Sequence, residues 1–252
     1  MRFKDLTILV TGGTGGLGSA IVRRFAEEGG RVAIADLDQA AGEQLAADVG
    51  NGARFLLLDV TDEAAWRQAL DVVDAQLGGL DVVINNAGFF EPNIPLEEMP
   101  LQLWRKHFAI NSDGVFLGCK HGILRLKKRG GGAIVNIGSS MSIKPHATSS
   151  AYCASKAAVL MTTRTAAAGA GQYNIRVNAV LPGPVKTRML MKNIVPDQHE
   201  AEFLDRLKLN SALGRMATPE EVANGVLFLA DPANTTISGT FLSIDAGNVS
   251  GN

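Results

Sequence analysis

The sequence predicts an α/β fold, a single-domain, doubly wound parallel sheet of about seven strands with helices on both faces. Short apolar runs rich in β-branched residues alternate with helical patterns along the whole chain. A glycine-rich loop joins the first apolar run to the first helical pattern. No linker-like segment or internal repeat interrupts this alternation, so we expect residues 1–252 to form one domain.

The composition argues against recognition of nucleic acids or membranes. The 252 residues carry a net charge of −1, and no long run of lysine and arginine marks a nucleic-acid site. No apolar run reaches the length of about 18 residues that a membrane span needs. The two cysteines lack metal-site spacing, and the chain enters its first strand without a leader pattern. We therefore expect a soluble, cytoplasmic protein without a metal, whose partner is a small molecule.

The first strand, the glycine loop and the first helix form a predicted phosphate site. Residues 6–11 have the pattern of a buried strand, and residues 19–28 that of an amphipathic helix. Glycines let the loop turn tightly against a pyrophosphate, which the helix N-terminus then binds, as in a Rossmann-type dinucleotide site. The loop residues expected to contact the cofactor are Gly12, Thr14, Gly16, Leu17 and Gly18.

Asp36 ends the second expected strand, residues 31–36, and indicates which dinucleotide binds. An acidic residue at this position binds both ribose hydroxyls of an adenosine and repels a 2′-phosphate. The next residue, Leu37, is not an arginine that would neutralise such a phosphate. The sequence therefore predicts NAD(H) rather than NADP(H). Asp36 is also a candidate N-cap for a helix over residues 39–49.

The middle of the chain continues the alternation. A third strand is expected over residues 54–60, and its polar end at Asp59 and Val60 suits the adenine edge of the cofactor. The patterns that follow are, in order, a helix over 62–77, a strand over 80–85 and an interrupted helix over 101–128.

A tyrosine and a lysine one helical turn apart are the candidate catalytic pair. Tyr152 and Lys156 lie in an alanine-rich helical pattern, where their spacing puts both side chains on one face. A nearby ammonium group favours a phenolate, so we expect Lys156 to lower the pKa of Tyr152 toward neutral pH. The strand before this helix delivers Ser139, whose hydroxyl would hold the substrate oxygen, and its neighbour Ser140 is the alternative serine.

The last third of the chain contains the expected substrate lid. Residues 188–213 are long, methionine-rich and without strand character, which suits a lid over an apolar ligand. The side chains expected to line the substrate pocket are Phe90, Met141, His146, Met189 and Leu190. The other expected elements are strands over 133–137, 174–180 and 240–245, a helix over 150–170 and a helix that begins at Thr218.

In these motifs the chain resembles the short-chain dehydrogenase/reductase family over essentially its whole length. The matching motifs are Thr11-Gly12-x3-Gly16-x-Gly18, Asn85-Asn-Ala-Gly88, Asn111, Ser139, Tyr152-x3-Lys156 and Pro182-Gly183. The resemblance implies that Asn111 kinks its helix and holds a water that links Lys156 to solvent. It also implies a homotetramer. The further cofactor contacts that it implies are Asn86, Ala87 and Gly88 at the adenosine and Pro182, Gly183, Val185 and Thr187 at the nicotinamide.

The hypothesis is an NAD(H)-dependent oxidoreductase that interconverts a hydrophobic secondary alcohol and its ketone. Tyr152 would be the general acid and base, Ser139 would orient the substrate oxygen, and Lys156 would bind the nicotinamide ribose. One alternative is an NADPH-type ketoreductase similar to β-ketoacyl reductases, which Asp36 disfavours. The other is a non-catalytic NAD(H) sensor or scaffold, which has no need of a tuned phenol.

Three positions depart from the family pattern. Gly138 replaces a common serine, so we expect a looser exit from the fifth strand. Ala246 stands where a second glycine is usual. Gly169, with a further glycine after it, weakens the last turn of the helix that carries Tyr152.

Overall fold

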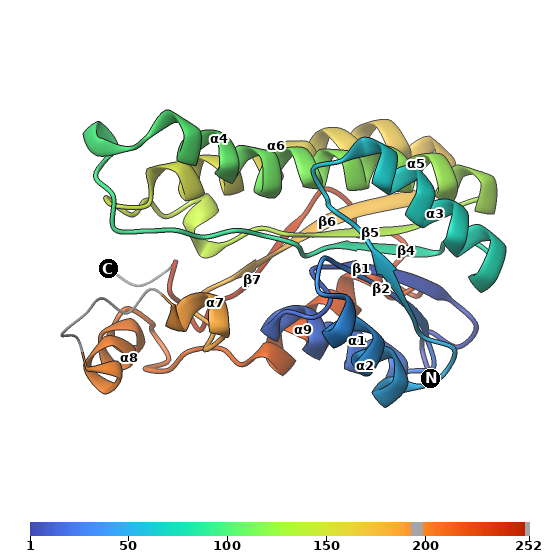
Figure 1. Ribbon diagram of the computed structural model, residues 1–252, viewed down its shortest axis with the longest axis horizontal. Coiled ribbons are helices and arrows are strands. Elements are labelled where there is room, and N and C mark those ends of the chain that lie inside the picture. Colours follow the sequence, from blue (N-terminus) through green and yellow to red (C-terminus); the bar gives the residue numbers. More distant parts are fainter. Residues whose placement is uncertain (193–198, 250–252) are drawn as a thin grey trace.

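The computed structural model, which describes residues 1–192 and 199–249, is built on one parallel sheet of seven strands in the order β3-β2-β1-β4-β5-β6-β7 (Figure 1). The strands are β1 (Thr7–Thr11), β2 (Arg31–Asp36), β3 (Arg54–Leu57), β4 (Val82–Asn85), β5 (Gly132–Ile137), β6 (Ile175–Pro182) and β7 (Phe241–Ile244). The strand order reverses between β1 and β4, which pair with Leu9 opposite Val83. Ligands of such sheets bind beyond the carboxyl ends of the strands at this reversal. The predicted fold class is confirmed.

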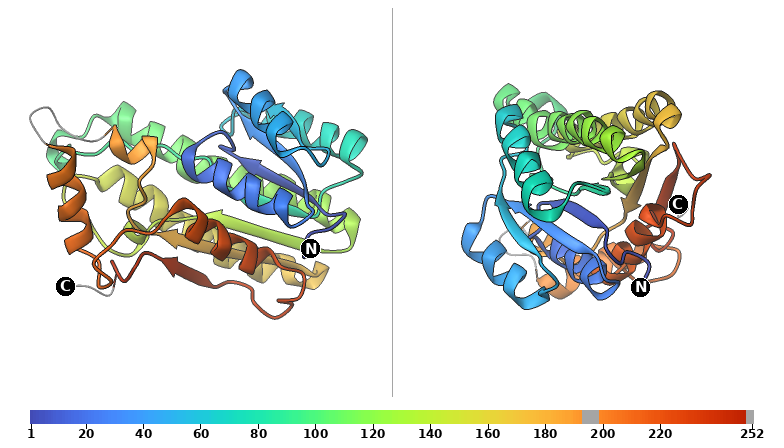
Figure 2. Two further views of the ribbon diagram at one scale, coloured as in Figure 1. Left: turned by 90° about the horizontal axis from the view of Figure 1, so that it is seen from below. Right: turned by 90° about the vertical axis from the view of Figure 1, so that its right-hand side faces the viewer.

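Helices cover both faces of the sheet (Figures 1 and 2). One face carries α1 (Gly16–Glu27), α2 (Gln39–Val49) and α9 (Pro219–Ala230), and the other carries α3 (Glu63–Leu77), α5 (Gly114–Arg129) and α6 (Ser150–Ala170). At the carboxyl ends of the strands, on the left of Figure 1, lie α4 (Leu101–Phe108), α7 (Arg188–Met191) and α8 (Glu200–Leu209). Within residues 1–192 and 199–249, no helix has the length and apolar content to cross a membrane.

Each face of the sheet buries its own apolar cluster. In β1, Ile8 and Val10 belong to the cluster under α1 and α9, whereas Leu9 belongs to the cluster under α3 and α5. Successive strand residues point to opposite faces, so a strand covered on both sides must be apolar throughout. This explains why the strands of this chain read as continuous apolar runs.

Two helix starts follow from capping side chains. Thr218 Oγ1 accepts from Glu221 N at 3.2 Å while the Glu221 carboxylate accepts from Thr218 N at 2.9 Å, which begins α9 as predicted. For α2 the cap is Asp38, whose carboxylate accepts from Ala41 N at 3.1 Å. The alternative that Asp36 caps this helix is wrong, because its carboxylate faces the glycine loop instead.

Among the differences from the sequence-based expectation are two element boundaries and the packing at the exit of one strand. The third strand ends at Leu57 rather than at residue 60, because the Asp59 carboxylate accepts from Thr61 N at 2.9 Å and turns the chain out of the sheet. Helix α1 begins at Gly16, so the last glycines of the loop form its first turn. The exit of β5 is tight rather than loose, because a Cβ on Gly138 would lie only 2.5 Å from the Leu181 side chain.

Candidate active site

The glycine loop lies against the end of β4 and leaves no room for a Cβ at Gly12 or Gly18. Gly12 has a φ of +61°, and a Cβ on it would lie 2.8 Å from Ala87 Cα. A Cβ on Gly18 would lie 2.0 Å from Gly12 O, so only glycine lets α1 approach the loop this closely. No side chain of the described residues caps the first turn of α1, and its amide groups therefore remain as donors for an anion.

Asp36 is fixed at the end of β2 by the glycine loop. Its Oδ2 accepts from Thr14 N at 2.9 Å and from Thr14 Oγ1 at 2.6 Å, and its Oδ1 accepts from Leu37 N at 2.7 Å. Leu37 itself is largely exposed beside it. The negative charge that was predicted to select the adenosine ribose is therefore held at the edge of the phosphate loop.

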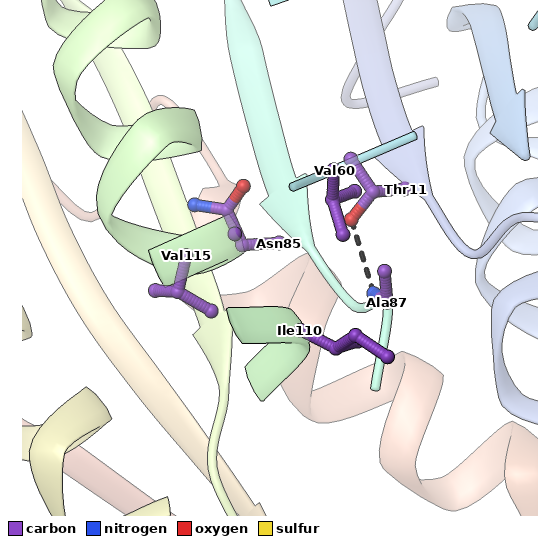
Figure 3. A pocket seen from close by; sticks show the side chains of 7 residues that line it. Thr11, Val60, Asn85, Ala87, Ile110 and Val115 are labelled. Carbon is purple, nitrogen blue, oxygen red and sulfur yellow. Dashed lines mark hydrogen bonds between the residues drawn. The ribbon is translucent and has the colours of Figure 1, made fainter. Parts of the chain in front are cut away.

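A small hollow lies between the ends of β1 and β4 and the start of α5 (Figure 3). Thr11 Oγ1 accepts from Asn86 N and Ala87 N, each at 3.0 Å, and the bond to Ala87 is the dashed line in Figure 3. The Asn86 side chain donates to Gly12 O at 3.0 Å and so ties the loop to β4. The residues that line the hollow are Thr11, Val60, Asn85, Ala87, Ile110, Gly114 and Val115. Val60 and Ala87, both predicted at the adenosine, thus meet in one place.

Three of the four predicted catalytic side chains, those of Ser139, Tyr152 and Lys156, converge at the carboxyl ends of β5 and β6, and the fourth, Asn111, is described below. Tyr152 and Lys156 share one face of α6, with Lys156 Nζ 5.9 Å from the centroid of the Tyr152 ring. Ser139 forms a side-chain hydrogen bond with Tyr152. Its Oγ also accepts from Met141 N at 3.1 Å, which fixes the hydroxyl oxygen. The alternative Ser140 is buried beside it.

Burial sets the protonation of the catalytic pair. It raises the pKa of Tyr152 to about 12, although the bond from Ser139 acts in the opposite direction. It lowers the pKa of Lys156 from its usual 10.5 to about 8. The expectation that Lys156 lowers the pKa of Tyr152 is not met in this arrangement. The reason is that the ammonium group donates to Ile137 O at 2.7 Å, while desolvation of the phenolate dominates.

Asn111 interrupts the long helix as predicted. It is fully buried in a π-helical turn, Ala109–Asp113, between α4 and α5. Its Oδ1 accepts from Phe89 N at 2.7 Å, and its Nδ2 donates to Phe89 O at 2.9 Å and to Ser155 Oγ at 3.0 Å. A Cβ on Gly88 would lie 3.5 Å from both Asn111 Oδ1 and Lys156 Nζ. Both groups of the predicted proton relay therefore face the same glycine, and the relay itself stays a prediction.

The loop after β6 lies across the glycine loop. Pro182 ends β6, and Gly183 packs so closely on Asp245 that a Cβ would lie 2.8 Å from its Cα. Val185 is buried and pairs with Ala217 through an isolated bridge. Thr187 then caps α7, and its side chain lies 3.2 Å from the position of a Gly16 Cβ.

The predicted substrate residues differ in how close they lie to Tyr152. The half-buried Phe90 ring packs on Tyr152, with 4.5 Å between ring centroids. Met141 is half-buried next to Ser139, whereas His146 is exposed, with Nδ1 3.1 Å from Ser149 Oγ. Met189 and Leu190 lie on α7, and α8 follows in the expected lid, of which residues 193–198 lie outside the described residues.

Four side chains of this site were not predicted. Thr11 lies directly before Gly12 of the glycine loop, and Ser155 lies between Tyr152 and Lys156. The neighbouring motif residues therefore indicate that both side chains lie near the site. Ser142 is signalled by its place three residues after Ser139, whose N it binds through Oγ at 3.0 Å. His107 lies in a charged stretch that gives no sign of a role, yet it is fully buried and its ring lies 6.4 Å from that of Tyr152.

Sequence comparison groups the chain with oxidoreductases. A family profile described as enoyl-(acyl carrier protein) reductase matches residues 12–248. The chain is 38% identical over 249 residues to the 2,5-dichloro-2,5-cyclohexadiene-1,4-diol dehydrogenase of Sphingobium indicum, covering 98% of this chain and 97% of that protein. It is also 38% identical to the 3-beta-hydroxysteroid dehydrogenase of Comamonas testosteroni, covering 97% of this chain and 96% of that protein.

Two further relatives agree with this grouping. The cis-4-hydroxycyclohexanecarboxylate dehydrogenase of Sinomonas cyclohexanicum is 38% identical, with 97% of each chain covered. A crystal structure of 3-ketoacyl-(acyl-carrier-protein) reductase from Brucella melitensis, complexed with NADH, superposes with a TM-score of 0.91 at 26% identity. That superposition covers 98% of this chain and 99% of the other.

Proposed function

The chain belongs to the short-chain dehydrogenase/reductase family, and we propose that it is an NAD(H)-dependent enzyme that interconverts a hydrophobic cyclic secondary alcohol and its ketone. It is an oxidoreductase that acts on CH–OH groups. The observation that carries the proposal is the meeting of Ser139, Tyr152 and Lys156 at the strand ends beside the glycine loop. The names of three relatives describe a cyclohexadiene diol, a hydroxysteroid and a hydroxycyclohexane carboxylate, which supports a cyclic substrate.

The residues fit a dinucleotide. A Cβ on Gly12 or Gly18 would meet the chain's own backbone, so only glycine lets the loop fold this closely onto the start of α1, whose first amide groups have no side-chain cap and would donate to a pyrophosphate. The Asp36 carboxylate is held at the edge of this loop, where it would meet the ribose hydroxyls. Leu37 brings no positive charge for a 2′-phosphate, which supports NAD(H) over NADP(H) and disfavours the NADPH-type ketoreductase. When bound, the nicotinamide would accept or supply the hydride.

The proton chemistry falls to the side chains of this chain. In ketone reduction the Tyr152 phenol donates its proton to the substrate oxygen, and in alcohol oxidation the phenolate removes it. With its pKa raised to about 12, the phenol is protonated at neutral pH, the form that reduction needs. Ser139 Oγ accepts from Met141 N and its side chain bonds to Tyr152, so the hydroxyl is held beside the phenol, where the substrate oxygen would bind. Lys156, one turn further along α6, has its ammonium group 5.9 Å from the centroid of the Tyr152 ring and would bind the nicotinamide ribose.

Assembly and location are further parts of the proposal. From the family we infer a homotetramer in the cytoplasm, with residues 1–252 acting as one domain and residues 188–213 covering the substrate. Light scattering on the purified protein measures the assembly. A monomer with full activity would contradict the tetramer.

The test follows reduced-nicotinamide absorbance with purified protein and a panel of cyclic, aryl-alkyl and steroid secondary alcohols. Each alcohol is run with NAD and with NADP, beside Tyr152→Phe as the control. We expect one class of cyclic alcohol to reduce NAD, with turnover lowered by about a hundredfold or more in Tyr152→Phe. Equal efficiency with NADP would contradict the cofactor assignment, and full activity of Tyr152→Phe would contradict the mechanism. NADH binding without any turnover would favour the sensor alternative.

A further inference from the structure

The segment that follows β4 is held at two points, one on each side of Phe90. Before Phe90, the backbone N and O of Phe89 both bond to the Asn111 carboxamide, at 2.7 Å and 2.9 Å. After Phe90, Glu91 N donates to His107 Nε2 at 3.3 Å. The residue between these two clamps packs its ring on Tyr152, with 4.5 Å between centroids and 56° between planes. The backbone around the aromatic wall of the active site is therefore fixed by Asn111 and His107.

The bonds of His107 select one form of its imidazole ring. His107 Nδ1 lies 3.0 Å from Leu103 O, and a carbonyl oxygen can only accept, so Nδ1 carries the proton. Nε2 faces Glu91 N, and an amide can only donate, so Nε2 is bare. Both bonds exist together only in the neutral Nδ1–H tautomer. Protonation would set two donors against each other at Nε2.

The surroundings of His107 favour that neutral form. The side chain is fully buried between Phe89, at 4.8 Å between ring centroids, and Tyr152 of α6. Burial lowers the pKa of His107, and the neighbouring Lys106 ammonium acts in the same direction. Two smaller causes act in the opposite direction: the bond to Leu103 O, which the neutral Nδ1–H form also makes, and the carboxylate of the exposed Glu91. The charged or titratable groups that face the ring are thus Lys106, Glu91 and the Tyr152 phenol.

We propose that His107 is a positioning residue that, as its Nδ1–H tautomer, holds Phe90 over Tyr152 and so shapes the apolar wall against which the substrate binds. This inference rests on the proposed function of the site. Ser139, Tyr152 and Lys156 are carried by α6 and the end of β5, not by the clamped segment. Loss of the clamp therefore weakens substrate binding more than it slows the chemical step.

The kinetic test compares two substitutions of His107. His107→Phe keeps a ring of similar size and removes both polar atoms, whereas His107→Gln keeps an acceptor near the position of Nε2. We expect His107→Phe to raise KM for the cyclic alcohol about tenfold, with a smaller change in kcat, because an unpaired buried amide frees the segment. His107→Gln is expected to return KM to within about threefold of wild type. Phe90→Ala alone raises KM, and adding His107→Phe to it changes KM little.

A purely structural role predicts a different pattern. His107→Phe would then lower both thermal stability and kcat, and each decrease would be the same in the wild-type background and in the Phe90→Ala background. His107→Gln would not restore KM. That pattern would overturn the proposal. NADH binding, followed by fluorescence, is the internal control and is expected to be the same in all variants.

The tautomer gives a readout that needs no turnover and no folded variant. The chain has four histidines, so ¹⁵N-histidine spectra of the wild-type protein are simple to assign. Two histidines are buried, His107 and His121, and the Nε2 of His121 lies 3.0 Å from a Glu63 carboxylate oxygen, which requires its proton on Nε2. We expect the signal of His107 to show the Nδ1–H tautomer at pH 7 and to keep it at pH 6. An Nε2–H tautomer or a charged ring at this position would overturn the clamp. If the spectra show the tautomer but no alcohol is turned over, the proposed function fails and the clamp stands.

Discussion

Lys156 is expected to make the folded protein less stable than it would be with an apolar residue. Lys156 is only 3% exposed, and burial lowers the pKa of its ammonium group from the usual 10.5 to about 8. At about 1.4 kcal/mol for each pH unit, this difference corresponds to about 3 kcal/mol against the charged form at pH 7. Lys156→Met removes the buried charge and keeps a flexible side chain of similar length. Loss of the hydrogen bond to Ile137 O offsets about 1–2 kcal/mol of the stability gained by removing the charge.

The Lys156→Met variant should therefore lose turnover. Its free energy of unfolding at pH 7 should be about 1–2 kcal/mol higher than that of the wild type. Below pH 8 the lysine is protonated in the folded and in the unfolded chain, so the full cost of burial is present. Between pH 8 and pH 10.5 the folded chain releases its proton first, and wild-type stability rises with pH. The advantage of Lys156→Met is thus largest at neutral pH and is lost toward pH 10.5.

The assay is urea unfolding followed by tryptophan fluorescence, at pH 7 and again near the upper end of this window, at one protein concentration. Lys128→Met, which replaces an exposed lysine at the end of α5, is the matched control and should change stability little at either pH. The reasoning is refuted if Lys156→Met is less stable than wild type at pH 7 by an amount that does not depend on pH.

Three further substitutions test other parts of the structure. Asp36→Asn keeps the shape of the side chain and removes its charge. The ratio of kcat/KM with NAD to kcat/KM with NADP should therefore fall by about tenfold or more. An unchanged ratio would mean that other groups select the cofactor. Ala246→Gly relieves a φ of +53° and should raise the free energy of unfolding by about 1 kcal/mol in urea, whereas a decrease would show that the turn is not strained. Arg176→Met leaves the carbonyls of Leu229 and Ala230 at the end of α9 without the guanidinium that binds them at 2.7 and 3.2 Å. It should cost about 2–4 kcal/mol, and a cost below about 1 kcal/mol would show that water replaces the guanidinium.

Much of this protein follows from patterns within single segments of the sequence. Residues 39–49 and 150–170 are helices with the bounds that their patterns predict, because helical periodicity and end signals are local properties. The spacing of Tyr152 and Lys156 placed both side chains on one face of α6 without any knowledge of the fold. The glycine loop was found in the same way, because it lies between one strand and one helix.

The tertiary structure decided what those side chains contact. Asp36 binds Thr14, 22 residues away, rather than the helix that follows it in the chain. Lys156 donates to Ile137 on β5 and is buried among elements distant in sequence, which shifts its pKa downward. His107 meets Tyr152 because α4 packs against α6, and its Nε2 meets Glu91 N because the segment after β4 passes beside α4. Desolvation and the pairing of donors with acceptors depend on all the neighbours of a group, and packing alone brings those neighbours together.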